Sequence, residues 1–264
     1  MGGNVAFLLF RKLSQIEVIS YIIKRKKGHK KMNAILKEGF EKFGINPTDE
    51  IEKKLNIFAD MLVETNEKVN LTSITERDEI YSKHFVDSVS CQGLIKDGAT
   101  VIDVGTGAGF PGIVLKIARP DIKITLLDSL RKRVDFLESV ISELGLEGIT
   151  AVHSRAEDAA VSDNMREKYD VAVSRAVANL PVLCEYCLPF VKIGGSFLAL
   201  KGRDADNEVK NAEKAVKILG GKTEKTEKVF WNNMEHRVVI IRKISKTPPK
   251  FPRKAGKPSK DPII

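Results

Sequence analysis

Three glycines at alternate positions mark the stretch of this chain with the most evident capacity to bind a ligand. Gly105, Gly107 and Gly109 interrupt the run 101–112, which begins as a short apolar segment of β-forming residues and continues with helical composition. A buried strand, a glycine-rich turn and the start of a helix, in that order, open a nucleotide-binding βαβ unit. Glycine permits the positive φ of such a turn and lets a ligand lie against the backbone. We therefore expect a nucleotide-containing cofactor at this turn.

Two cofactor classes fit the stretch. Residues 107–112 satisfy G-x-G-x-x-G, the dinucleotide fingerprint, and Asp128 ends the next expected strand near the ~20-residue offset of a ribose-binding acid. Residues 103–109 also spell D-x-G-x-G-x-G, the first motif of S-adenosylmethionine (AdoMet) methyltransferases. Asp103 favours AdoMet, because a carboxylate before the turn repels a pyrophosphate but attracts an ammonium and a sulfonium. AdoMet is the expected cofactor, and an NAD(P)-dependent oxidoreductase is the alternative; Asp128 suits either.

Strands and helices alternate downstream of the glycine turn. Strands are expected at 122–127, 149–153, 169–173 and, after a turn at Gly194 and Gly195, at 196–200, with helices at 129–144, 180–191 and 204–219. This order predicts an α/β fold with a mostly parallel, doubly wound sheet. Residues 225–231 and 238–244 suggest a terminal hairpin, which is typical of AdoMet methyltransferases and unusual for NAD-binding folds. We expect a Rossmann-like methyltransferase fold of seven strands that ends in an antiparallel pair.

Composition divides the chain into four regions. They are a basic extension at 1–31, a helical N-terminal region at 32–97, the cofactor-binding core at 98–246 and a basic, Pro/Lys-rich tail at 247–264 that we expect to be extended. The helical region is expected to hold helices at 32–43, at 47–66 and through Ser88, the last capped by Ser73 or Thr75. Met32 opens a fresh helical pattern directly after the basic run, so translation could start there.

The net charge of +9 is concentrated at the two ends of the chain. Residues 1–31 and residues 242–264 each hold eight Lys and Arg against one acid, which leaves the middle mildly acidic. Such ends suggest a polyanionic partner held by flexible arms, with solubilising tails as the alternative. The three cysteines form an odd, sparse set that suits a reducing cytoplasm. No apolar run approaches the ~20 residues that span a bilayer, so we expect no membrane association.

Polar residues follow the third expected strand, where ligands bind in open α/β sheets. An adenine ring needs an acceptor for its exocyclic amine and a partner for its ring nitrogen. The backbone of Ala156 and the carboxylate of Glu157 or Asp158 meet that requirement. We expect the adenine of the cofactor to lie there.

Arg175 follows the fourth expected strand, beside the position of the transferred methyl group. Its fork of donors suits a phosphate or a base edge, and a surface ion pair with Asp170 or Glu185 is the alternative. No Asn/Asp-Pro-Pro-Tyr/Phe motif of exocyclic-amine methyltransferases follows this strand, and no strand end carries a cysteine nucleophile. The acceptor should therefore be intrinsically nucleophilic, and guanine N7 fits. Catalysis would then be mostly alignment, with Arg175 as the candidate catalytic residue.

The chain resembles the bacterial ribosomal RNA small subunit methyltransferase G family, also called glucose-inhibited division protein B, from about Met32 to its end. The matching segments are NLTSIT at 70–75, KHFVDS at 83–88, DVGTGAGFPG at 103–112, DSLRKR at 128–133, RAE at 155–157, SRA at 174–176, LKG at 200–202 and FPRKAG at 251–256. Together these segments are highly specific, although any one alone would be weak. Residues 1–31 have no counterpart in the family pattern, which supports a start at Met32.

The resemblance implies AdoMet-dependent N7 methylation of one guanine in 16S ribosomal RNA, free or in the small ribosomal subunit, by a cytoplasmic enzyme without a metal. It places cofactor contacts at Gly105, Phe110, Ala156, Glu157 and Arg175, with Asp128 nearby. With the motif residues Asp103, Gly107 and Gly109, these complete the expected cofactor site. On charge and strand-end position, the candidates for RNA contact are His84, Lys201, Arg237, Arg253 and Lys254. We expect a monomer; a non-catalytic RNA-binding protein that keeps this fold is a further alternative.

Overall fold

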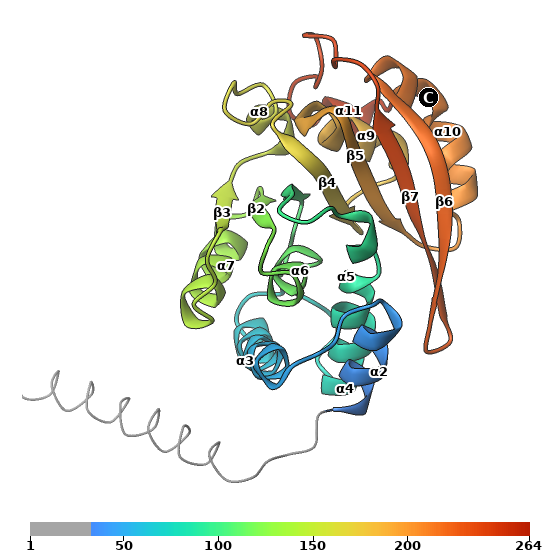
Figure 1. Ribbon diagram of the computed structural model, residues 1–264. Helices are drawn as coiled ribbons and strands as arrows, with labels where there is room; N and C mark the ends of the chain where they lie inside the picture. Colours follow the sequence, from blue (N-terminus) through green and yellow to red (C-terminus); the bar gives the residue numbers. More distant parts are fainter. Residues whose placement is uncertain (1–32) are drawn as a thin grey trace, which may run out of the picture. The chain divides into compact units, whose positions relative to one another are not determined.

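A seven-stranded sheet in the order β3-β2-β1-β4-β5-β7-β6 organises residues 33–264, the part of the chain that this computed structural model describes (Figure 1). Its strands are β1 (Thr100–Val104), β2 (Lys123–Asp128), β3 (Ile149–His153), β4 (Tyr169–Arg175), β5 (Val191–Lys201), β6 (Gly221–Trp231) and β7 (Met234–Lys243). The first five strands pair in parallel, whereas β7 pairs antiparallel with both β5 and β6. The predicted sheet and its terminal hairpin are confirmed. The basic extension predicted at 1–31 lies outside the described residues.

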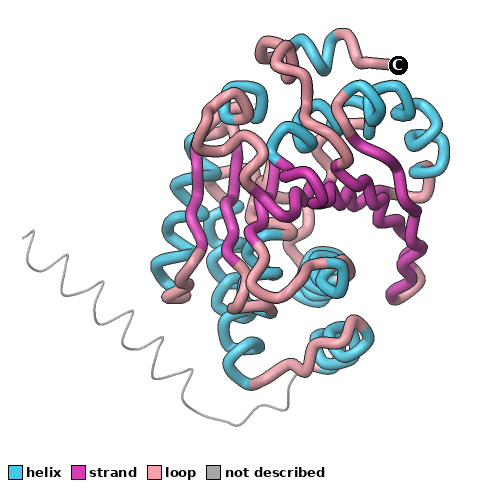
Figure 2. The backbone as a smooth tube through the Cα atoms, turned by 45° about the horizontal axis from the view of Figure 1, so that its top comes forward, coloured by secondary structure: helices cyan, strands magenta, loops and turns pink. Residues whose placement is uncertain are grey.

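Two hydrophobic cores cover the two faces of the sheet, because successive residues of a buried strand point to opposite faces. Val101 belongs to one core and Ile102 to the other. The first core packs against α2 (Ala34–Lys42), α3 (Asp49–Asn66), η1 (Ile80–Val86), α6 (Gly112–Ala118) and α7 (Arg131–Glu143). The second packs against α8 (Ala156–Ala159), α9 (Leu180–Cys187), η3 (Leu188–Phe190) and α10 (Ala205–Ile218). Helices on both sides of the strands give the doubly wound arrangement seen in Figure 2. Within residues 33–264, no helix has the length and apolar character needed to cross a membrane.

The third N-terminal helix differs from its prediction. It is built from α4 (Arg77–Glu79), the π-helical segment η1 and α5 (Asp87–Val89), followed by the 3₁₀ turn η2 (Gln92–Leu94). Glu76 occupies its N-cap position and no side chain caps it, so the expected capping by Ser73 or Thr75 is wrong. π-Helical turns are rare and occur frequently at functional sites. This one lies next to the carboxyl end of β4.

Strand β5 begins earlier than its sequence suggests. Gly194 and Gly195 were expected to form a turn, but both lie inside the strand Val191–Lys201. The pairing of β4 and β5 is irregular between Tyr169 and Val171. A Cβ on Gly195 would lie 2.5 Å from the Asp170 carbonyl, so this glycine permits a close backbone approach within the sheet.

The basic tail is folded, and the prediction that residues 247–264 are extended is wrong. Phe251 and Ile263 are buried in the second core, and the tail ends in the short helix α11 (Lys257–Lys260). Arg166 donates hydrogen bonds to the carbonyls of Thr247 (2.8 Å) and Phe251 (2.9 Å). The prediction failed because the charge and proline content of this segment conceal two apolar anchors.

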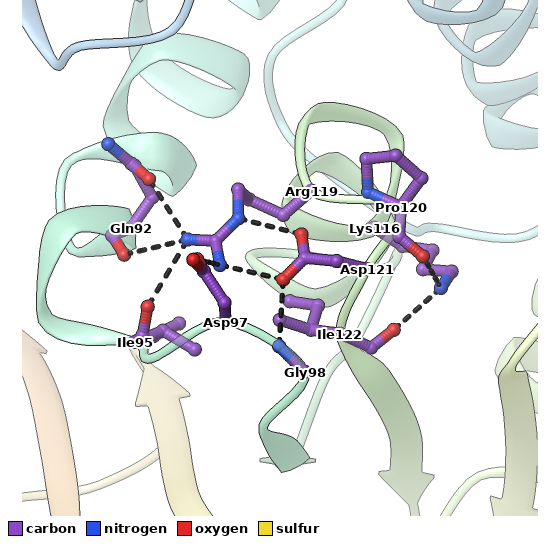
Figure 3. A network of polar contacts seen from close by, with 9 residues as sticks. All are labelled: Gln92, Ile95, Asp97, Gly98, Lys116, Arg119, Pro120, Asp121 and Ile122. Carbon is purple, nitrogen blue, oxygen red and sulfur yellow. Dashed lines mark hydrogen bonds and ion pairs between the residues drawn. The ribbon is translucent and has the colours of Figure 1, made fainter.

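A polar network joins the helical N-terminal region to the sheet at the amino ends of β1 and β2, opposite the end that carries the glycine turn (Figure 3). Arg119, which follows α6, donates to the Asp121 carboxylate twice at 2.8 Å and to Asp97 at 2.8 Å. It also reaches the carbonyl of Ile95 at 3.2 Å and the side chain of Gln92 at 3.3 Å. These hydrogen bonds lower the pKa of Asp121 to about 2. One guanidinium thus ties η2, the loop before β1 and the loop before β2 together.

We predict that Arg119→Ala lowers the free energy of unfolding by about 2–3 kcal/mol, because it leaves charged and carbonyl acceptors without their shared donor. Urea unfolding followed by circular dichroism measures the change. Arg131→Ala, at an exposed position on α7, is the matched control and should change the free energy by less than about 0.5 kcal/mol. Equal stabilities of the two variants would contradict the role given to this network.

Candidate active site

The backbone of the glycine turn is already hydrogen-bonded within the protein. Five of its N–H groups donate at 2.8–3.1 Å: those of Gly105, Thr106, Gly107, Gly109 and Phe110. The acceptors are the carbonyls of Leu127 and Thr106 and the carboxylate of Asp128. A pyrophosphate is bound at such a turn by N–H groups that are free to point at it. The turn is therefore poorly suited to a dinucleotide.

Asp103 lies beneath this turn and holds it in place. Its carboxylate accepts hydrogen bonds from the Thr106 hydroxyl (2.6 Å) and the Gly112 N–H (2.8 Å). A Cβ on Gly112 would come within 2.8 Å of that carboxylate, so a glycine is needed there. Burial raises the pKa of Asp103 to about 6, although both hydrogen bonds act to lower it. Asp103 thus supports the turn, and its side chain is fully buried and lines neither cavity of the site; the cofactor contact expected from the sequence stays a prediction.

Asp128 ends β2 where two cavities meet. Its carboxylate accepts hydrogen bonds from the N–H groups of Gly107 and Leu130, both at 2.9 Å, and Arg133 lies 3.5 Å away. The cavities have volumes of ≈ 520 Å³ and ≈ 250 Å³. Four residues line both of them: Gly105, Asp128, Ser129 and Val177. The acid predicted to bind ribose therefore lies where the two cavities meet.

The smaller cavity is lined by the residues predicted to meet the adenine. Ala156 and Glu157 begin α8 and contribute to its wall, together with Tyr186 of α9 and Ser259 of α11. Glu157 is buried and its carboxylate accepts a hydrogen bond from the Gly256 N–H at 2.8 Å. The folded tail therefore completes this cavity.

The larger cavity is bounded by Arg175 at the end of β4 and by Phe110 and His84. The Arg175 guanidinium donates to the carboxylate of Asp87 (2.6 Å), the carbonyl of Lys83 (3.1 Å) and the Nδ1 atom of His84 (3.1 Å). Its central carbon lies 5.0 Å from the centre of the Phe110 ring. The π-helical segment η1 and α5 supply all three hydrogen-bonding partners, so the N-terminal helices fix the position of this cation.

His84 is neutral in this arrangement. A guanidinium only donates, so Nδ1 of His84 accepts, and Nε2 carries the proton that is shared with the Thr72 hydroxyl at 2.9 Å. The imidazole also stacks on Phe110, with ring centres 4.4 Å apart. Burial, helped by the nearby charge of Arg175, lowers the pKa of His84 to about 4. Of the two basic side chains at this wall of the larger cavity, Arg175 carries a positive charge and His84 does not.

The other four residues predicted to contact RNA differ in whether their charge is already paired within the protein. Three are engaged in ion pairs with acids of this chain: Lys201 with Glu208 (2.8 Å), Arg237 with Glu235 (2.7 Å) and Arg253 with Glu185 (2.7 Å). Arg253 holds the tail on α9, because Glu185 is almost fully buried and accepts from it at several positions. Lys254 is exposed. Charge and strand-end position alone could not separate paired from exposed cations.

Several residues of the site were not found from the sequence, Asp87 and Tyr186 among them. Asp87 pairs with Arg175, in place of the Asp170 or Glu185 considered above, and its second oxygen lies 3.2 Å from Nδ1 of His236. Tyr186 lines the smaller cavity. Asp87 belongs to the KHFVDS segment that carries the resemblance, so a residue-by-residue comparison of that segment could have found it. Gly109, expected at the cofactor, lines neither cavity and serves the turn through its backbone.

Comparisons with known proteins identify the family of this chain. The sequence model of the rRNA small subunit methyltransferase G family matches residues 51–238. The ribosomal RNA small subunit methyltransferase G of Acetivibrio thermocellus is 51% identical over 236 residues, which cover 88% of this chain and 97% of the relative. That of Desulfitobacterium hafniense is 53% identical over 219 residues, 82% of this chain and 90% of the relative.

The chain belongs to the ribosomal RNA small subunit methyltransferase G family. The solved structure of a mutant of MtNAS shares its fold, with a TM-score of 0.50 over 74% of this chain and 75% of the other, at 12% identity. As a family member the chain has the Rossmann-like AdoMet methyltransferase fold and AdoMet as its cofactor. The dinucleotide alternative is therefore excluded.

We predict that Asp128→Ala weakens AdoMet binding at least about tenfold, or about 1.4 kcal/mol, because the carboxylate lines both cavities and fixes the Gly107 backbone. Isothermal titration calorimetry measures the dissociation constant. Glu213→Ala removes an exposed acid of α10 that lines neither cavity and is the control, with unchanged affinity expected. Equal affinities of wild type and Asp128→Ala would contradict the cofactor role of this carboxylate.

We also predict that His84 titrates near pH 4. Its pKa in the folded protein lies below the ordinary value of 6.5, so the imidazole is neutral at pH 7. As the pH falls from about 6.5 to 4, the unfolded chain takes up this proton more readily than the folded protein, so the free energy of unfolding decreases over that range. NMR of imidazole-labelled protein, with the signal assigned by comparison with His84→Gln, follows the titration. A midpoint near 6.5 would show that His84 is not buried against Arg175.

Proposed function

We propose that this member of the methyltransferase G family methylates N7 of a specific guanine in 16S ribosomal RNA, acting as a monomer in the cytoplasm. The observation that carries the proposal is the larger cavity, which extends from the glycine turn to a fixed arginine and whose histidine, His84, has both ring nitrogens engaged. Its volume of ≈ 520 Å³ leaves room for a base beside the end of a cofactor.

The residues of the two cavities fit AdoMet. Ala156 and Glu157 line the smaller cavity and would contact the adenine, and Asp128 would contact the ribose hydroxyls. The turn from Gly105 to Ala108 lines the larger cavity, where the amino-acid end of the cofactor would lie. Asp103 adds a buried negative charge below this turn, and one of its oxygens has no hydrogen-bond partner within residues 33–264. When bound, AdoMet supplies the methyl group.

The protein's own part in the reaction is alignment. Guanine N7 has a lone pair in the plane of the ring, so it can accept a methyl group without first losing a proton. His84 is neutral and already engaged on both ring nitrogens, which removes it as a proton acceptor. Holding an acceptor nitrogen in line with a reacting carbon can by itself supply a large part of a rate enhancement.

Arg175 is the group that we assign to hold the guanine. Three of its five N–H groups are used by Asp87, His84 and Lys83, which leaves two for a substrate among the contacts of residues 33–264. The O6 and N7 edge of guanine is the acceptor that an arginine contacts most often, and a contact at O6 would leave N7 open to the methyl group. Asp87 acts through Arg175, so it is a positioning residue.

The remaining alternative is a non-catalytic RNA-binding protein on the same fold. The placement of a fixed cation at the meeting point of the glycine turn, β4 and η1 favours an enzyme, because RNA binding alone would not require it to be buried beside a cofactor cavity. Measured methyl transfer decides between them.

We predict that Arg175→Ala lowers the rate of methylation at least about 100-fold, and Asp87→Asn about tenfold, with unchanged AdoMet affinity in Asp87→Asn. The assay uses small subunits from cells that lack the protein, and N7-methylguanine is mapped by chemical cleavage of the 16S RNA. Arg242→Ala breaks an exposed arginine–carboxylate pair with Glu224 at 3.0 Å and is the matched control, with wild-type activity expected. Full activity in Arg175→Ala would refute its assigned role, and no methylation by the wild type would refute the function.

A further inference from the structure

The tip of the β6–β7 hairpin forms a further cavity, separate from the two cavities of the candidate active site. It has a volume of ≈ 320 Å³ and is lined by Lys42, Arg203 and the residues 230–235. Figure 1 shows the tip running past the rest of the sheet to lie beside α2. Asn232 and Asn233 both have positive φ, 44° and 62°, and make the two-residue turn between the strands.

The residues of this cavity have the chemistry of a nucleotide site. Phe230 exposes 54% of its surface, an unusual position for a phenylalanine, and Lys42 and Arg203 beside it are both exposed. The one acid in the cavity, Glu235, is paired with Arg237 at 2.7 Å, and that pairing lowers the pKa of the carboxyl group. An open aromatic face flanked by two cations can stack a base and bind its phosphate.

The hairpin tip lies at the same end of the sheet as the candidate active site, the end formed by the carboxyl ends of the parallel strands. In the β5–β7 pair, Lys201 is opposite Arg237, so residues 231–234 extend beyond the carboxyl end of β5. The Trp231 indole donates to the Ser82 hydroxyl at 3.0 Å, and Ser82 lies two residues before His84 in η1. His84 lines the cofactor cavity. Segment η1 therefore lies next to both cavities: Ser82 contacts Trp231 of the hairpin-tip cavity, and His84 lines the larger cavity.

We propose that the hairpin-tip cavity binds an unpaired nucleotide of the substrate RNA close to the methylated guanine, with its base stacked on Phe230 and its phosphate held by Lys42 and Arg203. This rests on the proposed function and adds a second RNA contact to it. A single-stranded segment is required, because a base inside a helix is not free to stack on a side chain. Two contacts on either side of η1 would fix the direction of the RNA strand relative to the cofactor.

The test compares Phe230→Ala, Phe230→Trp and the double variant Lys42→Ala/Arg203→Ala with wild type. Small subunits from cells that lack the protein serve as substrate, and direct binding to naked 16S RNA is measured by filter retention without AdoMet. Ile244→Ala is the matched control, because Ile244 is 55% exposed and follows the other end of β7.

Phe230→Ala should raise KM and the RNA dissociation constant about tenfold, with kcat and AdoMet affinity unchanged, and Phe230→Trp should restore both. The double variant should reduce the slope of log affinity against log salt by about one or two. Wild-type RNA affinity in Phe230→Ala, or a loss confined to kcat, would overturn the proposal. Loss of affinity for subunits but not for naked RNA would assign the surface to a ribosomal protein and would also overturn it. Because RNA binding is measured without AdoMet, failure of the wild type to methylate RNA would count against the proposed function alone.

Discussion

Two carboxylates, those of Asp103 and Asp128, lie on either side of the glycine turn, and their charge and hydrogen bonds determine which cofactor the turn after β1 can bind. Asp103 holds the turn from beneath through Thr106 and Gly112, and Asp128 holds it from β2 through Gly107. The bond to Asp128 uses the Gly107 N–H, which a phosphate at this turn would need, and the two carboxylates make the surroundings of the turn negative. The same arrangement favours a cofactor that is cationic at its reactive end. The rest of the site follows from it, since Asp128 divides the space above the turn into two cavities.

Segments far apart in the chain complete the site. Asp87 on α5 fixes Arg175 on β4 although 88 residues separate them. The C-terminal tail reaches back to α8 and α9 and closes the smaller cavity, where Gly256 donates to Glu157 and Arg253 covers Glu185. Both of these acids are buried, and a buried charge is stable only when it is paired. The basic tail thus contributes to the cofactor site, and the charge that suggests an RNA-binding arm is in part used within the protein.

The features that sequence analysis could predict are those with a local signal. The glycine spacing, the strand–helix alternation and the acid at the end of β2 depend on residues close in sequence, and the sheet confirms them. The packing of the tail could not be predicted, because Arg253 and Glu185 are 68 residues apart and nothing near either one marks the pair. The burial of Asp103 and its hydrogen bonds to Thr106 and Gly112 could not be predicted either, because a motif gives the residue type but not the direction of its side chain. The residues alone favoured AdoMet and an acceptor such as guanine N7, and the family resemblance added that the guanine belongs to 16S ribosomal RNA.

The most direct test of the central claim is calorimetric titration of the wild-type protein with AdoMet and, separately, with NAD. A turn whose N–H groups are engaged and flanked by two carboxylates should bind AdoMet with a measurable dissociation constant and give no heat of binding with NAD. Binding of NAD with an affinity equal to or greater than that of AdoMet would contradict the account.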